Sequence, residues 1–174
     1  MVTTRALVER RERTLAMVRP DPAERVRSVQ LYGVDPVVAG QAVRILVEED
    51  LADHIDLNFG CPVPKVTRRG GGAALPWKRD LLAAILRETV RAAEAASRAA
   101  RRDVPVPVTM KMRIGIDPEH ETFLEAGRTA QDAGIAAVTL HARTAREHYS
   151  GHAHWERVAA LKEAVDIPVL GNGD

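Results

Sequence analysis

A single cysteine lies in a setting that suits acid chemistry. Cys61 ends the segment Asn58-Phe59-Gly60-Cys61 and is followed by Pro62. Gly60 permits a tight turn and Pro62 prevents a strand from continuing, so the thiol is expected to project above the end of a strand. A lone cysteine is more often a small buried hydrophobe than a reactive group. Because this one is expected on a loop beside Asn58, the residues alone give the two interpretations equal weight.

Polar residues also recur near the ends of apolar segments. The pairs are Ser28 and Gln30, Asp56 and Asn58, Thr109 and Lys111, and Thr139 and His141. Residues two apart on a strand face the same side. A lysine buried there without a partner would be costly. We therefore interpret the four pairs as a site at the carboxyl ends of parallel strands, the alternative being polar residues with a structural role only.

The elements that would position these pairs alternate along the chain. Strands are expected at Arg27–Tyr32, His54–Asn58, Val106–Arg113, Ala137–Ala142 and Ile167–Gly171. Each is rich in Val, Ile, Leu or Thr and is bounded by Gly, Pro or Asp. The alternation with helical segments implies parallel strands joined by right-handed crossovers. Five such units fit either an open doubly wound sheet or part of an eight-stranded barrel.

Helices are expected between the strands. The pairs Asp35-Pro36 and Asp117-Pro118 are typical helix starts, and Gly134 is expected to end the second of these helices. Apolar stripes place the longest helix around Leu82–Ala93 and another around Trp155–Val165. The N-terminal segment, where apolar residues are spaced among many charges, is also expected to be helical.

Composition indicates one soluble globular domain over residues 1–174. The chain is 45% hydrophobic and 28% charged, which excludes a disordered polymer. Its net charge of +1 does not argue for nucleic acid, so any RNA contact must come from local basic clusters. One cysteine forms no internal disulfide, which fits a reducing compartment. Because no apolar run is long enough to cross a membrane, we expect a cytoplasmic protein.

Two glycine-rich turns are candidate phosphate sites. Gly70-Gly71-Gly72 follows the basic segment Lys65–Arg69, and three glycines can present backbone N–H groups to a phosphate. The Gly-Lys-Ser/Thr ending of a nucleoside-triphosphate loop is absent, and a flexible loop over the site is the alternative. Gly171–Asp174 directly follows the last expected strand, where barrels often bind phosphate. Ordinary turn chemistry explains that segment equally well.

Further along, histidines and arginines gather in one stretch. His148, His152 and His154 lack the regular spacing of a metal site, so we expect no metal. Arg143 and Arg146 are candidate contacts for an anionic substrate.

Together these residues resemble the tRNA-dihydrouridine synthase family, particularly its bacterial branch. The similar segments are Ser28–Leu31, Ile55–Pro62, Gly70–Leu75, Met110–Arg113, His141–Thr144, Tyr149–Gly151 and Pro168–Asp174. They follow one another in order through nearly the whole chain. The Asn-x-Gly-Cys-Pro segment, combined with the later lysine and the His-x-Arg-Thr element, is highly specific, whereas any single segment is not.

The resemblance implies a flavin mononucleotide (FMN) cofactor in a (β/α)8 TIM barrel. In the family, NAD(P)H reduces the flavin, hydride passes to C6 of a uracil flipped out of tRNA, and a cysteine acid protonates C5. That acid corresponds to Cys61. The C5–C6 double bond accepts hydride only if the carbanion developing at C5 is protonated, so a hydride donor and an acid must face each other.

The resemblance also implies roles for other positions. Gln30 and Lys111 match contacts to the flavin ring, and His141 matches a residue at the flavin and the substrate. Asn58 matches the residue that orients the uracil, and Arg143 is expected to bind substrate. Asn172, Gly173 and Asp174 fall in a turn on the phosphate side.

Compared with the family, the chain is expected to be a central fragment. We expect about five of the eight βα units, with the N-terminal strands, the last strand and the C-terminal helical tRNA-binding domain missing. Such a partial barrel leaves two unpaired edges. We expect the chain alone to be unstable or to aggregate, to bind FMN poorly and to be inactive.

Other interpretations stay open at this stage. A dihydroorotate dehydrogenase-like FMN barrel would act on a free pyrimidine, and a flavin-free barrel would bind only phosphate. An inactive truncated product could bind RNA through its basic residues, which are Lys65, Arg68, Arg69, Arg143 and Arg146. The sequence does not indicate the oligomeric state, the tRNA position or the preferred nicotinamide nucleotide.

Overall fold

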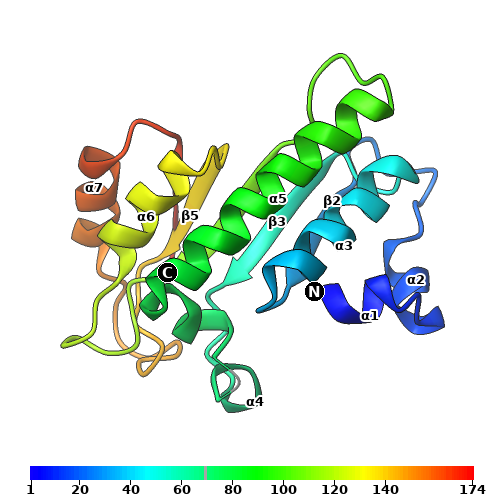
Figure 1. Cartoon of the computed structure of the whole chain (residues 1–174). Helices are drawn as coiled ribbons and strands as arrows, with labels where there is room; N and C mark the ends of the chain where they lie inside the picture. Colours follow the sequence, from blue (N-terminus) through cyan, green and yellow to red (C-terminus); the bar gives the residue numbers. More distant parts are fainter. Residues whose placement is uncertain (69) are drawn as a thin grey trace.

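A parallel sheet forms the centre of the molecule. The computed structural model describes residues 1–68 and 70–174, and in this part of the chain six strands pair in sequence order, all parallel (Figure 1). They are β1 (Val2–Thr3), β2 (Ser28–Tyr32), β3 (His54–Phe59), β4 (Val108–Arg113), β5 (Ala137–His141) and β6 (Val169–Asn172).

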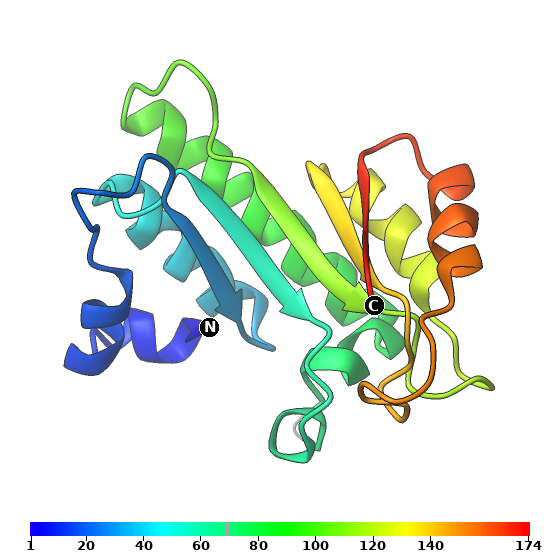
Figure 2. The ribbon, with the colours of Figure 1, turned by 180° about the vertical axis from the view of Figure 1, so that it is seen from behind.

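Helices connect the strands. They are α1 (Thr4–Val8), α2 (Glu12–Val18), α3 (Pro36–Glu48), α4 (Pro64–Thr67), the 3-10 helix η1 (Gly72–Trp77), α5 (Arg79–Ala99), α6 (Phe123–Asp132) and α7 (Trp155–Ala164). The crossover helices α3, α5, α6 and α7 lie on one side of the sheet (Figure 1), and the view from behind shows the strands in front of them (Figure 2).

The order of the strands decides between the two expected architectures. A doubly wound sheet reverses its strand order and carries helices on both faces. Here the strands follow one another without reversal, and the crossover helices share one face. The fold is therefore α/β with the winding of a (β/α) barrel, of which the described strands form a part.

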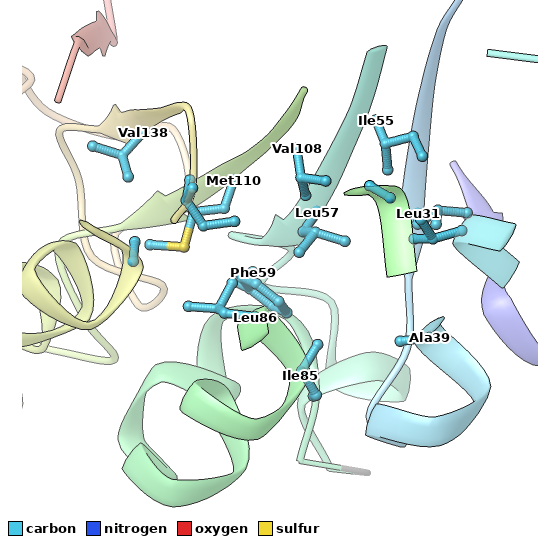
Figure 3. Packing of buried hydrophobic residues seen from close by; sticks show 14 of the residues in the cluster. Leu31, Ala39, Ile55, Leu57, Phe59, Ile85, Leu86, Val108, Met110 and Val138 are labelled. Atoms are coloured by element: carbon cyan, nitrogen blue, oxygen red, sulfur yellow. The ribbon is translucent and has the colours of Figure 1, made fainter. Parts of the chain in front are cut away.

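Strict alternation in β3 produces the core. Ile55, Leu57 and Phe59 are at most 3% exposed, and they face Ile85 and Leu86 of α5 (Figure 3). A strand side chain points to alternate faces, so every second residue meets the helices. Full burial of one such side chain stabilises the fold by roughly 1.5–3 kcal/mol. This packing fixes the register that sends the intervening polar residues to the opposite face.

The expected elements are largely confirmed. All five expected strands are present, and the Asp35-Pro36 start is confirmed, because the Asp35 carboxylate accepts a hydrogen bond from Val38 N at 3.1 Å. Gly134 follows α6 with a φ of 83°, a left-handed conformation that glycine adopts at low cost. No helix among the described residues is both long and apolar enough to cross a membrane.

Two expectations are wrong. Asp117-Pro118 does not start a helix, because the Asp117 carboxylate pairs with His120 and Arg146, and α6 begins only at Phe123. The N-terminal segment contains helices α1 and α2, as expected, but Val2–Thr3 forms a sixth strand that the sequence did not predict. Two residues carry no periodic signal, and β1 exists because it pairs with Leu31 and Tyr32 of β2.

Candidate functional site

The predicted polar pairs lie in register across neighbouring strands. Gln30 is paired with Asp56, and Asp56 with Thr109. Two residues nearer the carboxyl ends of the strands, Asn58 is paired with Lys111. Parallel pairing places equivalent steps of neighbouring strands at the same height, which is why residues distant in sequence meet here.

Hydrogen bonds join the side chains of this polar face. Gln30 Nε2 donates to Asp56 Oδ2 at 2.8 Å, and Thr109 Oγ1 donates to Asp56 Oδ1 at 2.7 Å. Asn58 Nδ2 donates to Gln30 Oε1 at 2.9 Å. His54 Nε2 lies 2.9 Å from Thr109 Oγ1. The network keeps polar groups satisfied on a face that an ordinary core would fill with apolar residues.

Asn58 also forms the turn that carries the cysteine. Its Oδ1 accepts hydrogen bonds from Gly60 N at 3.2 Å and from Cys61 N at 3.0 Å. This is an Asx turn, in which a side-chain oxygen replaces a backbone acceptor. Cys61, a free thiol, is half-buried at the end of β3. The turn after the strand, which the glycine and proline around the cysteine predicted, is confirmed.

The glycine-rich segment supports this turn. Gly72 has a φ of 55°, and a Cβ there would collide with the Cys61 carbonyl oxygen. Ala73 N donates to that oxygen at 3.0 Å. The N–H groups of Gly70 and Gly71 donate to Thr67 and Val66 carbonyls, so both are engaged within the loop. Glycine is therefore needed at position 72 for close approach to the cysteine.

A pocket of about 310 Å³ opens beside the thiol. It is lined by Asn58, Gly60, Cys61, Pro62, Val63, Lys111, Arg113, His141, His148 and Tyr149. The set combines residues from the ends of β3, β4 and β5 with residues from the loops that follow β3 and β5. The structure thus brings Cys61, Asn58, Lys111 and His141, which the sequence singled out, to one cavity.

Lys111 and His141 face this cavity with altered proton affinities. Lys111 Nζ donates to Asn172 Oδ1 at 2.8 Å, and burial lowers the pKa of its ammonium group. His141 is 5% exposed, and burial, followed by the charge of Arg113 and other nearby cations, lowers its pKa to about 4. The imidazole is therefore neutral at pH 7. Its buried Nε2 has no hydrogen-bond partner within the described part of the chain.

Arg113 ties two loops together beneath the pocket. Its guanidinium donates to the carbonyl oxygens of Gly60 at 3.1 Å, Thr144 at 2.8 Å and His148 at 2.7 Å. The same group lies 5.3 Å from the ring centroid of Tyr149. No role for Arg113 was predicted from the sequence. Its spacing could have indicated one, because Arg113 follows Lys111 by two residues, as Lys111 follows Thr109, so all three side chains face the same side of β4.

Arg143 is placed differently from the other candidates. It is 4% exposed, donates to the carbonyl oxygens of Ser150 at 3.1 Å and Gly151 at 2.7 Å, and pairs with Asp174. Asp174 also accepts from Ala153 N at 3.0 Å. These bonds hold the loop after β5 against the residues after β6. The substrate role of Arg143 and the phosphate role of Asp174 remain predictions.

Asn172 and Gly173 lie on the same edge of the molecule. Asn172 is the partner of Lys111, and its carbonyl oxygen accepts from Ala142 N at 2.9 Å. A Cβ on Gly173 would lie 2.6 Å from the Ala153 Cβ, so no larger residue fits without a shift. The turn is therefore packed against the loop after β5.

The remaining basic residues lie outside the pocket lining. Lys65, Arg68 and Arg146 are exposed, and Arg146 pairs with Asp117 at 3.1 Å. Arg69 lies outside the described residues.

The histidines of the loop after β5 form no common ligand set within the described residues. His154 Nε2 instead lies 2.7 Å from Glu147 Oε1. Elsewhere, Asp117, Glu119 and His120 place one ligand atom each within 4.8 Å of one another, and Asp117 is already paired with Arg146.

The fold and the site together define a class of protein. Parallel βα units with cationic, amide and imidazole groups at the carboxyl ends of the strands, and a thiol on the next turn, form a barrel-type site for a small ligand. The family model described as dihydrouridine synthase (Dus) matches residues 1–174. The chain belongs to this family.

Curated relatives agree with the family model. The "Probable tRNA-dihydrouridine synthase" of Mycobacterium leprae is 57% identical over 175 residues, covering 100% of this chain and 44% of the relative. A protein with the same name from Mycobacterium tuberculosis is 56% identical over the whole chain and 43% of the relative. The tRNA-dihydrouridine synthase B of Salmonella typhimurium is 42% identical over 86% of this chain and 43% of its own length.

The chain therefore spans less than half the length of these relatives. Among solved structures, a rubisco-like protein from Burkholderia fungorum aligns with 97% of this chain and 33% of its own, with a TM-score of 0.48 and 12% identity. That likeness is too weak to carry an argument.

Proposed function

We propose that this chain provides the proton-donating thiol and part of the flavin site of a tRNA-dihydrouridine synthase. The enzyme would reduce the C5–C6 bond of a uracil in tRNA, using FMN and NAD(P)H. The observation that carries the proposal is the position of Cys61. Its turn is held by Asn58 at the rim of the pocket, and Lys111 and His141 line the same pocket. Family membership and the names of the relatives support it.

The residues around the pocket fit an FMN ring and its phosphate. The unpartnered Nε2 of His141 is a buried polar atom that a ligand would satisfy. Lys111 is a cation that would stabilise negative charge on the pyrimidine end of the ring, and Gln30 offers an amide on the same face of the sheet. Asn172, Gly173 and Asp174 would lie toward the phosphate. FMN, when bound, supplies the hydride that it has received from NAD(P)H.

Cys61 then has one task, to deliver a proton to C5 of the uracil. A thiol suits this step because it can donate its proton as a general acid. Asn58 would hold the uracil edge, and His141, neutral because of its low pKa, would accept or donate a hydrogen bond without adding charge. General acid catalysis of this kind typically contributes a factor of about 10² to 10⁴.

Transfer RNA is the proposed partner of the whole protein. The exposed cations Lys65, Arg68 and Arg146 belong to the segments that follow β3 and β5, and cations near a site attract RNA phosphates. We place the reaction in the cytoplasm.

The cofactor part of the proposal is tested by FMN binding. Titration of FMN fluorescence would compare the chain with Lys111→Met and with Lys162→Met, a matched control on the exposed side of α7. We expect Lys111→Met to weaken binding about tenfold or more, as for the loss of a charge-assisted contact, and Lys162→Met to leave it unchanged. Measurable and equal affinities in all three proteins would contradict the assignment of the flavin site.

The catalytic part is tested by dihydrouridine formation in unmodified tRNA. Because the chain spans 44% of the Mycobacterium leprae relative, the assay would include both this chain and that relative with the matching change. We expect dihydrouridine formation only in the longer relative, where the change that matches Cys61→Ala should lower the rate about 100-fold or more. Turnover at the unaltered rate would contradict the role of the thiol.

A further inference from the structure

One carboxylate lies at the centre of the polar face. Asp56 receives two hydrogen bonds from opposite sides, from Gln30 Nε2 at 2.8 Å and from Thr109 Oγ1 at 2.7 Å. It lies two residues before Asn58 on the same strand, and its own side chain is not part of the pocket lining.

The donors and acceptors of these groups allow only one orientation for each of the two side-chain amides between Asp56 and Cys61. An ionised carboxylate only accepts hydrogen bonds, so Gln30 must turn its NH2 group toward Asp56. The carbonyl end of Gln30 then faces Asn58, which must offer its own NH2 group. Reversing either amide would set two acceptors or two donors against each other. Amide orientation is normally ambiguous, and here a neighbour that cannot donate removes the ambiguity.

The same order of donors and acceptors extends to the backbone of the Cys61 turn. With its NH2 group turned to Gln30, Asn58 points Oδ1 at Gly60 N and Cys61 N, at 3.2 Å and 3.0 Å. Those two groups are donors only, so an Asn58 turned the other way could not form the Asx turn. The position of the Cys61 turn thus depends on a series of oriented hydrogen bonds that starts at Asp56, two residues before Asn58.

The hydrogen bonds on the other side of Asp56, through Thr109 and His54, do not require one fixed direction. The Thr109 hydroxyl both donates and accepts, and the imidazole of His54 can hold its proton on either nitrogen. Loss of the Thr109 hydroxyl therefore leaves the order from Asp56 to Cys61 intact. This asymmetry supplies an internal control.

We propose that Asp56 is a positioning residue that fixes the amide orientations of Gln30 and Asn58, and thereby makes Asn58 a hydrogen-bond donor toward the pocket. One N–H of Asn58 is bonded to Gln30, and the other has no acceptor among the described residues. A donor at this place selects a base edge with a carbonyl oxygen, as in uracil, over one with an amino group, as in cytosine. This specificity part rests on the proposed function.

The first experiment measures the turn itself. Cys61 is the only cysteine in the sequence, so its alkylation by iodoacetamide reports on one site. Backbone amide resonances of Gly60 and Cys61 report on the bonds to Asn58. We expect Asp56→Ala to move both resonances and to change the alkylation rate about two- to tenfold, the range for losing one hydrogen bond. Thr109→Val, the matched control, should change neither.

Two further variants keep the test decisive if Asp56→Ala does not fold. Gln30→Glu is isosteric but places an acceptor against Asp56, so it should disturb the same two resonances. Asp56→Asn can still present an oxygen to Gln30 in one of its two orientations, so it should give an intermediate effect. Unchanged resonances in Gln30→Glu, or equal effects of Thr109→Val and Asp56→Ala, would overturn the proposal.

The second experiment tests the specificity part with nucleotides as probes. We expect uridine 5′-monophosphate to slow alkylation of Cys61 more than cytidine 5′-monophosphate does, and Asp56→Ala to remove the difference. If neither nucleotide protects the unaltered chain, the substrate class in the proposed function is wrong for this pocket and the specificity part is overturned with it. The amide resonances of the first experiment would still decide whether Asp56 positions Asn58.

Discussion

The two faces of the central sheet differ although the same strands form them. Strand β3 turns Leu57 and Phe59 toward the helices, where each is at most 3% exposed. The alternating residues Asp56 and Asn58 therefore lie on the opposite face. The helix-covered face is continuous and apolar. The opposite face is joined by side-chain hydrogen bonds and ends at the pocket beside Cys61.

This difference separates stability from chemistry within one element. Apolar burial supplies most of the free energy of folding and is indifferent to direction. Hydrogen bonds contribute less net free energy but fix orientation, which a site requires. We therefore expect changes on the helix-covered face to lower stability most, and changes on the polar face to act mainly on the Cys61 turn.

The largest expected effect is on the helix-covered face. Phe59→Ala should lower the free energy of unfolding by about 3–5 kcal/mol, because it removes a fully buried ring and leaves a cavity. Urea unfolding followed by circular dichroism would measure it. Asn58→Ala, one residue away on the other face, is the comparison. If both variants lose the same free energy of unfolding, the two faces do not differ in their contribution to stability.

The next largest effect is expected for Arg113, which joins the loops that follow β3 and β5. Arg113→Met should lower the free energy of unfolding by about 3 kcal/mol, because the carbonyl oxygens of Gly60, Thr144 and His148 lose a charged donor. It should also change the alkylation rate of Cys61, since Gly60 precedes the cysteine. An Arg113→Lys variant should recover part of the stability. Full stability in Arg113→Met would show that the loops do not depend on this residue.

A third effect is the pH dependence of stability. Burial lowers the pKa of His141 to about 4, so between pH 6.5 and 4 the unfolded chain binds more protons than the folded one. Stability should therefore be full above pH 6.5 and should fall, by on the order of 2–3 kcal/mol, as the pH drops to 4. Thermal unfolding at several pH values would measure the slope.

The control for this pH dependence is an exposed histidine. His141→Gln should flatten the slope between pH 6.5 and 4, and His152→Gln, at a fully exposed side chain 3.9 Å from Asp174, is the comparison. Glu147, whose pKa is lowered to about 2 by hydrogen bonds from His154 and Thr144 in spite of burial, loses its contribution in a lower window, as the pH falls from 4.5 to 2. An unchanged slope in His141→Gln would contradict the assignment.

The smallest effect is expected for a polar residue of the open face that has no recorded hydrogen bond among the described side chains. Thr139→Val keeps the shape of the side chain and removes only the hydroxyl. We expect the free energy of unfolding to change by less than about 0.5 kcal/mol, a typical value for a site without packing or network partners. A loss as large as that of Phe59→Ala would mean that this face also stabilises the fold.

Much of this architecture could be read from the chain alone. Short runs rich in Val, Ile, Leu or Thr and bounded by Gly, Pro or Asp predicted the five longer strands. The Asp35-Pro36 pair predicted the start of α3, and the Asn58–Pro62 segment predicted a cysteine on a turn. These signals are local, since they depend on side-chain direction, capping and turn chemistry over a few residues.

Other features were decided only by the tertiary structure. Strand β1 is too short to carry a pattern and exists through its pairing with β2. Asp117 has the local signature of a helix cap, but Arg146 and His120 compete for its carboxylate. Arg113 became a link between loops because residues distant in sequence bring their carbonyl oxygens to it.

The sequence therefore determined which residues could do chemistry and on which strands they lie. The tertiary structure decided which of them meet, and in which orientation their hydrogen bonds run. The physical reason is that propensity and periodicity act over a few residues, whereas register and loop contacts join distant positions. Gln30 and Asp56 are 26 residues apart, and Lys111 and Asn172 are 61 residues apart.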